Sequence, residues 1–286
     1  MFIQLVVSGI AIGAIYALVA IGFTLLWQAS RTVNFAQGDF LTVSAVLMFI
    51  FVCLGVPFVW ALLMTVLISA AMLGYVVKKG LIQPLINRSH TTIIVATIAL
   101  SFLANNSVAA FWSTQCKAFP QIFGMMPYRI GSIVLSRQHV WTIVIATALI
   151  LAINLFIQRT KPGKAMQAVA QNREAASVLG VNITRVTTMV FIMNAVIVAF
   201  AAMLIAPVYM VRFDMGLHLG LKAFYSAMIG GFNQVRGALL GGFLVGVIET
   251  FTSAYISNEY REVIVLVVLI GVILIRKEGL LGTEER

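Results

Sequence analysis

Long apolar stretches without charged side chains dominate this sequence. The first covers residues 2–27, and about 20 apolar residues in a helix are enough to cross the hydrocarbon core of a membrane. We therefore predict an all-α, polytopic integral membrane protein. Similar stretches cover residues 59–77, 92–112, 140–157, 186–211 and 237–257.

The composition agrees with this class of protein. Hydrophobic residues make up 61% of the 286 residues and charged residues only 10%. The net charge of +10 comes from basic residues in short loops between apolar stretches, as the positive-inside rule produces. No continuous basic surface is available for nucleic acid, so membrane lipid is the expected environment. The length allows about eight or nine membrane passes in a single transmembrane domain, residues 1–286, and no soluble domain.

Charges at the ends of the stretches predict the orientation. The first basic residue is Arg31, after the first stretch, which puts the N-terminus outside; Arg276 and Lys277 put the C-terminus inside. Ends on opposite sides of the membrane require an odd number of crossings, so residues 217–232 must cross as a short pass before the last two passes, residues 237–257 and 263–275, giving about nine passes. The alternative is about eight passes, with that segment re-entrant and the N-terminus inside. Cys53 and Cys116 would both lie near the outer face, and a disulfide between them stays open.

A polar interruption follows the first stretch. Residues 31–40 contain Asn34, Gln37, Gly38 and Asp39, and the apolar run after them, residues 41–54, is unusually short. This pattern is typical of a broken membrane helix, which is tolerated only where the backbone lines a cavity or packs within protein. An ordinary cytoplasmic loop is the equally simple alternative.

Polar side chains inside the other stretches are candidates for a translocation path. They are costly in lipid and are expected to face the bundle interior, either as links between helices or along the path. For Glu249, packing or gating is favoured over direct contact with a substrate. With the residues of the interruption, the path candidates are Asn34, Gln37, Asp39, Asn105, Asn106, Asn194 and Glu249.

Glycines at four-residue spacing mark candidate helix-packing faces. This spacing lets two membrane helices approach closely. The first stretch contains one such pair and the stretch after residue 236 contains two overlapping pairs. The residues are Gly9, Gly13, Gly237, Gly241, Gly242 and Gly246.

Residues 160–182 form a polar, basic island between two apolar stretches. Pro162 and Gly163 interrupt any preceding helix, residues 165–179 are good helix formers, and Gly180 is a plausible helix end. A basic surface helix between membrane spans can lie on anionic headgroups or bind another protein. A simple solvated loop is the third interpretation.

No catalytic or cofactor-binding pattern is present. The sequence around Lys164 lacks the first glycine and the Ser or Thr of a phosphate-binding loop. His90, His139 and His218 are scattered without the spacing of metal ligands. We therefore expect no enzymatic activity, no metal and no cofactor.

Four segments together resemble the branched-chain amino acid permease family of ABC importers, and within it the LivH-like subunits. The string from Asn34 to Asp39, Asn-Phe-Ala-Gln-Gly-Asp, is the most specific of them. The island also contains Glu-Ala-Ala, three residues, then Gly, which resembles the importer signature, although the proline-containing tail of that signature is missing. The four segments are residues 13–25, 33–40, 163–180 and 220–249.

The resemblance implies a non-catalytic subunit of a bacterial inner-membrane importer. A second, LivM-like permease subunit would complete the path, two cytoplasmic ATPases would bind the island, and a periplasmic binding protein would deliver the substrate. Leucine, isoleucine or valine is the family's usual substrate, while other amino acids, amides or urea stay open. The alternative is a secondary transporter or channel that acts alone. The residues expected to contact the ATPase are Lys164, Ala168, Arg173, Glu174, Ala175, Ala176 and Gly180.

Overall fold

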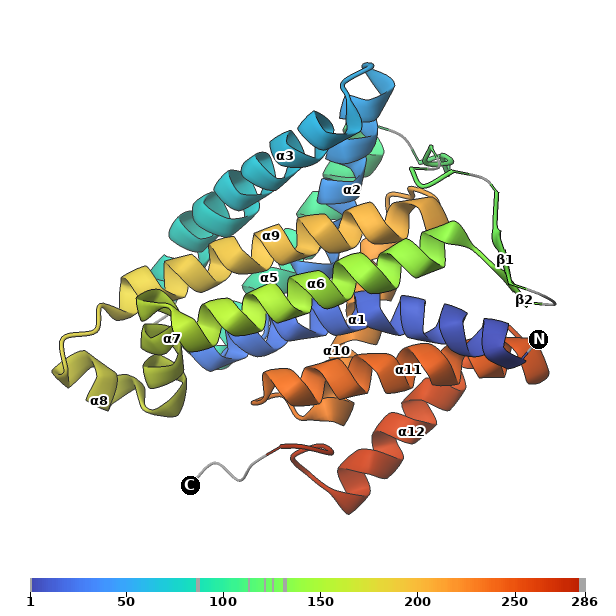
Figure 1. The fold of residues 1–286 in the computed structure, drawn as a ribbon. Coiled ribbons are helices and arrows are strands. Elements are labelled where there is room, and N and C mark those ends of the chain that lie inside the picture. Colours follow the sequence, from blue (N-terminus) through green and yellow to red (C-terminus); the bar gives the residue numbers. More distant parts are fainter. Residues whose placement is uncertain are drawn as a thin grey trace.

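The computed structural model describes residues 2–85, 88–112, 114–120, 122–124, 126–130 and 133–282. Across these residues the protein is a helical bundle with one short hairpin, as the sequence predicted. Two long helices, α1 (Phe2–Ser30) and α9 (Ile183–Tyr209), contact each other at its centre and run in opposite directions (Figure 1). A helix that is apolar on all faces belongs in a core, and both helices are buried on almost every side.

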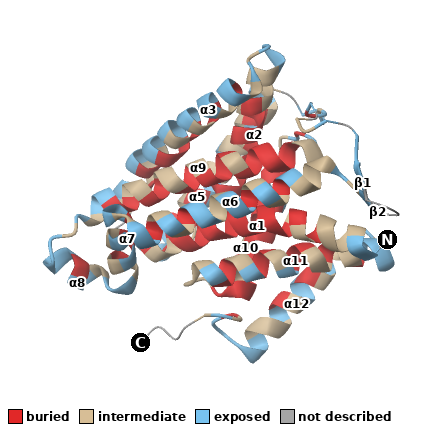
Figure 2. Ribbon diagram, viewed as in Figure 1, coloured by how far each residue is buried: buried red, intermediate tan, exposed pale blue. Residues whose placement is uncertain are grey.

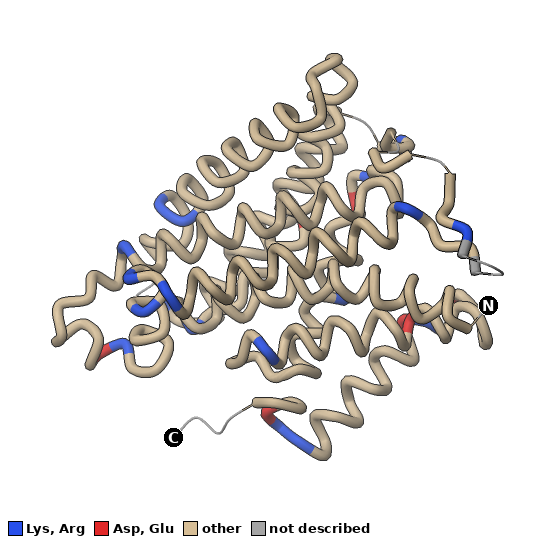
Figure 3. Tube along the Cα trace, viewed as in Figure 1, with Lys and Arg blue, Asp and Glu red and all other residues tan. Residues whose placement is uncertain are grey.

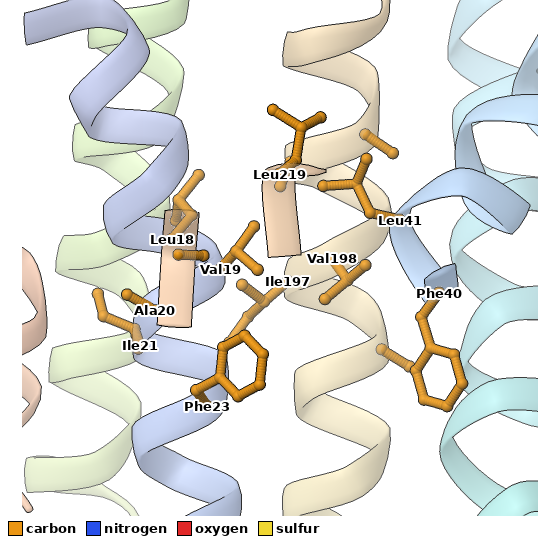
Figure 4. Close-up of a cluster of buried hydrophobic side chains, with 14 of the residues drawn as sticks. Leu18, Val19, Ala20, Ile21, Phe23, Phe40, Leu41, Ile197, Val198 and Leu219 are labelled. Atoms are coloured by element: carbon orange, nitrogen blue, oxygen red, sulfur yellow. The ribbon is translucent and has the colours of Figure 1, made fainter. Parts of the chain in front are cut away.

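The core lies where these two helices meet the shorter helices α2 (Gln37–Cys53) and α10 (Met215–Gly230). Leu18 of α1, Leu41 of α2 and Val198 of α9 are fully buried. Figure 4 shows their side chains with those of neighbouring core residues in the space between the helices. The two short helices also contact each other within this core.

The remaining helices surround this core. The segment Phe58–Leu85, which consists of α3 (Phe58–Ser69), η1 (Ala70–Val76), η2 (Lys78–Ile82) and α4 (Gln83–Leu85), packs along α9. The helix α11 (Val235–Tyr255) packs along α1, and α12 (Arg261–Ile275) packs against α10 and α11. The helices α5 (His90–Phe111) and α6 (Arg137–Arg159) complete the outer layer.

The outer helices expose apolar side chains. Leu67 of α3, Phe102 of α5 and Leu151 of α6 are all more than half exposed. Figure 2 shows exposed residues along these helices, while buried residues concentrate on α1 and α9. Apolar side chains on the outside of a helical bundle suit contact with lipid or with other membrane subunits.

Six helical segments in the described part of the chain are long and apolar enough to cross a membrane, and α2 is a shorter apolar helix. Together with the short helices α10 and α12, they correspond to the segments that the sequence predicted. The positions of the two ends relative to the membrane stay predictions.

The two halves of the chain use the same order of elements. In each half a long central helix (α1 or α9) is followed by a non-helical break, a short helix (α2 or α10) and two outer helices. The helix α1 packs on α11 of the second half, whereas α9 packs on the α3–η1 segment of the first. Because α1 and α9 run in opposite directions, this is the arrangement of an inverted repeat, which is common in transporters.

The hairpin and the basic island lie at opposite ends of the molecule (Figure 1). The hairpin consists of β1 (Tyr128–Ile130) and β2 (Ile133–Leu135), near the N-terminus. The island forms the helices α7 (Lys161–Gln171) and α8 (Arg173–Val178). Figure 3 shows basic residues gathered around α7 and α8, with a smaller group near the hairpin.

Candidate functional site

The polar interruption is a true break between α1 and α2. The backbone of Arg31 has φ of 54°, a left-handed conformation that turns the chain after α1. The chain then returns into the bundle, where the Gln37 side-chain amide donates a hydrogen bond to the Val19 carbonyl at 2.9 Å. The Asn34 side-chain oxygen accepts a hydrogen bond from the Ala36 backbone N–H at 3.1 Å. The helix α2 therefore begins inside the bundle, which confirms the broken helix and excludes the ordinary loop.

The breaks of the two halves bring α2 and α10 into close contact. A Cβ atom on Gly220 would lie 2.6 Å from Gly38 Cα, so only glycines fit at this crossing. The Gly216 N–H also donates a hydrogen bond to the Thr42 hydroxyl at 2.8 Å. We did not single out Gly216 and Gly220 from the sequence, although their four-residue spacing is the same signal that marked the other glycine faces.

Asp39 points from α2 toward α5. Its carboxyl group accepts a hydrogen bond from the Ser101 hydroxyl, and the Asn105 side chain lies beside it. Asp39 is only 1% exposed, and its Oδ1 atom has no hydrogen-bond partner among the described residues. The structure thus brings Asp39 and Asn105 together. Asn106 instead lies on an exposed face of α5 and donates to the Phe102 carbonyl of its own helix, so it does not face the bundle interior as predicted.

Asn194 lies on the other side of α2, next to Gln37. Both side chains come so close to Gly22 of α1 that a Cβ atom there would lie 2.7 Å from Gln37 Nε2. Asn194 is 1% exposed, and neither polar atom of its side chain has a partner among the described residues. Asn34, Gln37 and Asn194 therefore form a polar group inside the bundle, separate from Asp39.

Glu249 belongs to a buried charged cluster instead. It pairs with Lys222 of α10 at 2.5 Å and accepts a hydrogen bond from the Tyr16 hydroxyl of α1 at 2.7 Å. Arg261, at the start of α12, contributes a third contact at 3.4 Å. Glu249 and Lys222 are 3% and 6% exposed. The cluster joins four helices, and its opposite charges compensate each other. Sequence reasoning considered Glu249 without its partner, although two opposite charges in neighbouring membrane segments suggest a pair.

The predicted glycine faces of α1 and α11 lie against each other. A Cβ atom on Gly13 would lie 2.9 Å from the Gly242 carbonyl oxygen, and Gly246 lies against Gly9 and Gly13. The remaining two glycines, Gly237 and Gly241, face α10. The helices α1 and α11 therefore approach each other backbone to backbone.

The basic island consists of two helices, where the sequence predicted one. The Thr160 hydroxyl caps α7 by accepting from the Gly163 N–H at 3.1 Å. At Asn172 the backbone leaves the helical conformation, and its side chain caps α8 by accepting from the Ala175 N–H at 2.9 Å. Asn side chains compete in this way with helical hydrogen bonds, which explains the break between two runs of good helix formers. Gly180 ends α8 with φ of +85°, as its position suggested.

The island residues differ in exposure. Ala176 is buried, and Val169 of α7 is 2% exposed, so one side of the helix pair packs onto the bundle. The opposite side ends in two apolar residues that sequence reasoning missed, Val178 and Leu179, which are 88% and 82% exposed. Of the predicted contact residues, Ala168 and Arg173 are partly exposed, and the exposed ones are Lys164, Glu174, Ala175 and Gly180.

Neither a metal cluster nor a disulfide occurs in the described part of the chain. Groups of three or more His, Cys, Asp or Glu side chains that could hold a metal ion are absent from these residues. Cys53 and Cys116 are both free and exposed.

The chain is similar over almost its whole length to known transport proteins. The chain is 29% identical to the high-affinity branched-chain amino acid transport system permease protein LivH of Salmonella typhimurium, over 99% of this chain and 96% of the relative. It is 28% identical to the corresponding protein BraD of Pseudomonas aeruginosa, over 99% of this chain and 97% of the relative.

Among solved structures, PsaBC from Streptococcus pneumoniae in complex with Fab is similar, with a TM-score of 0.50 over 93% of this chain and 88% of that chain. Its sequence identity is 12%, so this likeness concerns the fold alone. The family model for the permease component of the branched-chain amino acid transport system matches residues 5–273. This match covers nearly the whole chain, and the protein therefore belongs to that family of permease components.

Proposed function

We propose that this chain is a membrane subunit of an ATP-driven importer that moves branched-chain amino acids across a bacterial inner membrane. It carries no catalytic function of its own, and partner ATPases hydrolyse the ATP. The family and the names of the relatives support the substrate class. The single observation that supports the ATP-driven mode is the helix pair α7–α8, which presents an exposed apolar tip at one end of the bundle.

The tip of α8 has the properties of a protein-binding surface. Val178 and Leu179 place two large apolar side chains in solvent, which costs free energy unless a partner covers them. Lys164 and Glu174 of the same helix pair are also exposed and can form polar contacts with a partner. Two ATPases would each receive such a tip, one from this chain and one from a second, LivM-like permease subunit.

The helix pair is also connected to the broken helix. The Arg31 guanidinium donates a hydrogen bond to the Ala170 carbonyl of α7 at 3.2 Å, and Arg31 is the first residue of the break. A movement of α7 and α8 caused by an ATPase would therefore also move Arg31 and the start of α2. We infer that this is how ATPase closure changes the exposure of the path.

The proposed binding of the ATPase to α7 and α8 also determines the orientation of the chain in the membrane. The end with α7 and α8 faces the cytoplasm, and the end with the hairpin and the N-terminus faces the periplasm, where a substrate-binding protein would dock. The path runs between this chain and the second permease subunit. Asp39 and Asn105 are its best-supported candidates in this chain, because both lie near an open face of the bundle.

A secondary transporter that acts alone is a weaker interpretation. Coupling to an ion needs a titratable group that can change its charge during transport. Glu249, the predicted candidate, is held by Lys222, Tyr16 and Arg261, as expected of a structural link between helices. The exposed tip of α8 would also have no role in such a protein.

The test is co-purification from detergent-solubilised native membranes. Wild-type protein should retain an ATPase with Walker motifs, and the double substitution Val178→Asp, Leu179→Asp should lose it. The control Val134→Asp changes an exposed apolar residue of β2 at the other end of the molecule and should retain the ATPase. A wild-type protein that purifies alone and still moves leucine across liposome membranes without ATP would overturn the proposal.

A further inference from the structure

A small pocket opens between α5, α10 and the break before α2. Its volume is about 140 Å³. Apolar side chains form most of its wall, and the only polar side chains that line it are Ser101 and Asn105, both on α5, among the described residues. Ser101 donates a hydrogen bond to the Asp39 carboxyl group, and Asn105 lies beside that group. The pocket therefore combines an apolar wall with a polar edge that leads directly to a carboxyl group. The apolar lining consists of Phe23, Phe35, Ile98, Phe102, Leu217, Leu221 and Phe224, with Gly216 and Gly220.

We propose that this pocket holds the substrate amino acid during its passage, with the branched side chain against the apolar wall and the ammonium group toward Asp39, Ser101 and Asn105. This inference rests on the proposed function and adds a recognition site to it. The site distinguishes ligands by an ammonium group and a compact apolar side chain. No basic residue lines the pocket among the described residues, so the pocket offers no cationic partner for the carboxylate of the amino acid.

The polar edge suits an ammonium group. Asp39 is 1% exposed, and no basic side chain forms an ion pair with it in the part of the chain that the structure describes. A buried carboxyl group with one oxygen unpartnered is unfavourable on its own, and a cationic ligand relieves this cost. The Ser101 hydroxyl and the Asn105 side-chain oxygen can accept further hydrogen bonds from an ammonium group, which has three N–H donors.

The apolar wall suits a branched aliphatic side chain. A cavity of about 150 Å³ lined by Leu, Ile and Phe is large enough for benzene, and this pocket is of similar size. It therefore has room for an isopropyl or isobutyl group. The rings of Phe23 and Phe35 both pack against Phe224, each with a centroid distance of 5.8 Å, which makes this side of the pocket rigid.

The pocket is accessible from the surface of the bundle. Phe102 and Leu217 are 66% and 47% exposed, and they border the opening on α5 and α10. Asn105, at the edge of this otherwise apolar opening, would lack a hydrogen-bond partner from lipid. The same opening suits a path between two permease subunits, in which a substrate passes from one side to the other.

Photo-crosslinking in the complete importer tests this inference. The probe is photo-leucine, a leucine analogue with a diazirine in its side chain, added to the purified importer in liposomes. We expect labelled peptides from α5 and α10, and loss of the label with excess leucine but not with excess 4-methylpentanoate, which lacks the ammonium group. Leucine amide, which lacks the carboxylate, should compete as leucine does.

Two substitutions and a control complete the test. Asp39→Asn keeps the shape and removes the charge, and it should lower the labelling about tenfold or more. Leu217→Trp fills the pocket and should reduce leucine uptake more than alanine uptake. Leu151→Trp on the exposed face of α6 is the control and should change neither. Each variant is compared only when it elutes with its partner subunits as wild type does.

The outcomes separate the site from the proposed function. If wild-type importer accumulates leucine on ATP addition but the label lies outside α5 and α10, or Asp39→Asn is labelled like wild type, the inference is wrong and the proposed function stands. If the wild-type importer neither accumulates leucine nor takes up the label, the proposed substrate class falls together with the site.

Discussion

The buried pair of Lys222 and Glu249 gives a quantitative prediction, because Glu249 has more additional hydrogen-bond and charge partners than Lys222. Glu249 has two further partners, Tyr16 at 2.7 Å and Arg261 at 3.4 Å. Among the described residues, Lys222 has only one further acidic neighbour, Glu262, at 3.8 Å, and the Glu262 side chain is 52% exposed. An exposed partner at this distance contributes little. Removal of Glu249 therefore leaves an almost uncompensated charge, whereas removal of Lys222 does not.

The expected costs follow from this asymmetry. Glu249→Gln should destabilise the protein by roughly 3–5 kcal/mol, as expected when a buried ion pair loses one partner. Lys222→Met should cost about 1–3 kcal/mol, because Glu249 keeps two charge-assisted or polar contacts. The double substitution should come within about 1 kcal/mol of Lys222→Met alone, since Arg261 is partly exposed and can turn to solvent.

These differences in stability are measured as midpoints of thermal unfolding in detergent, with size-exclusion chromatography to detect the protein that stays folded after heating. One kcal/mol corresponds to roughly 2–4 °C in chains of a few hundred residues, so the two single variants should be clearly separated. Glu249→Gln should have the lower midpoint, and the added Lys222→Met should raise it again. A Lys222→Met midpoint at or below that of Glu249→Gln, or strictly additive losses in the double variant, would refute the reasoning.

Three further predictions test packing, capping and orientation. Gly246→Ala places a Cβ atom against the backbone of Gly13 and should cost about 1–3 kcal/mol, whereas Gly271→Ala, with open space around it, should be neutral or stabilising in the same thermal assay. Asn172→Ala removes the cap of α8 and should cost about 1 kcal/mol, seen as faster amide hydrogen exchange in that helix, while Asn172→Asp should keep wild-type exchange. A membrane-impermeant maleimide should label Cys53 and Cys116 in intact spheroplasts without prior reduction, and labelling only after permeabilisation would reverse the orientation.

The sequence predicted the helical segments and the broken helix because their signals are local. Apolar length identifies a membrane helix directly, and the polar string around Gln37 interrupts it within a few residues. The division of the island at Asn172 was missed because helix propensities on both sides favoured a continuous helix. The cap at Asn172 depends on one side-chain conformation, which propensity does not report.

The site depends on contacts between distant segments, which the sequence did not reveal. Asn105 and Asn106 look equivalent in sequence, but they point about 100° apart around a helix, and only the rotation of α5 decides which of them meets Asp39. The partner of Glu249 became visible only when α10 packed against α11. Single intramembrane charges can thus be recognised as important before their roles can be assigned.

The break before α2 connects the two candidate sites of this chain. Arg31, at one end of the break, contacts α7, and Phe35, four residues later, lines the pocket beside α5 and α10. Because α2 begins two residues after Phe35 and carries Asp39, we expect a shift of α7 to change the position of the pocket wall and of the carboxyl group together. A continuous helix would instead transmit the shift along its axis and leave the pocket unchanged. We therefore expect the broken helix to be the part of the fold that couples the cytoplasmic surface to the path.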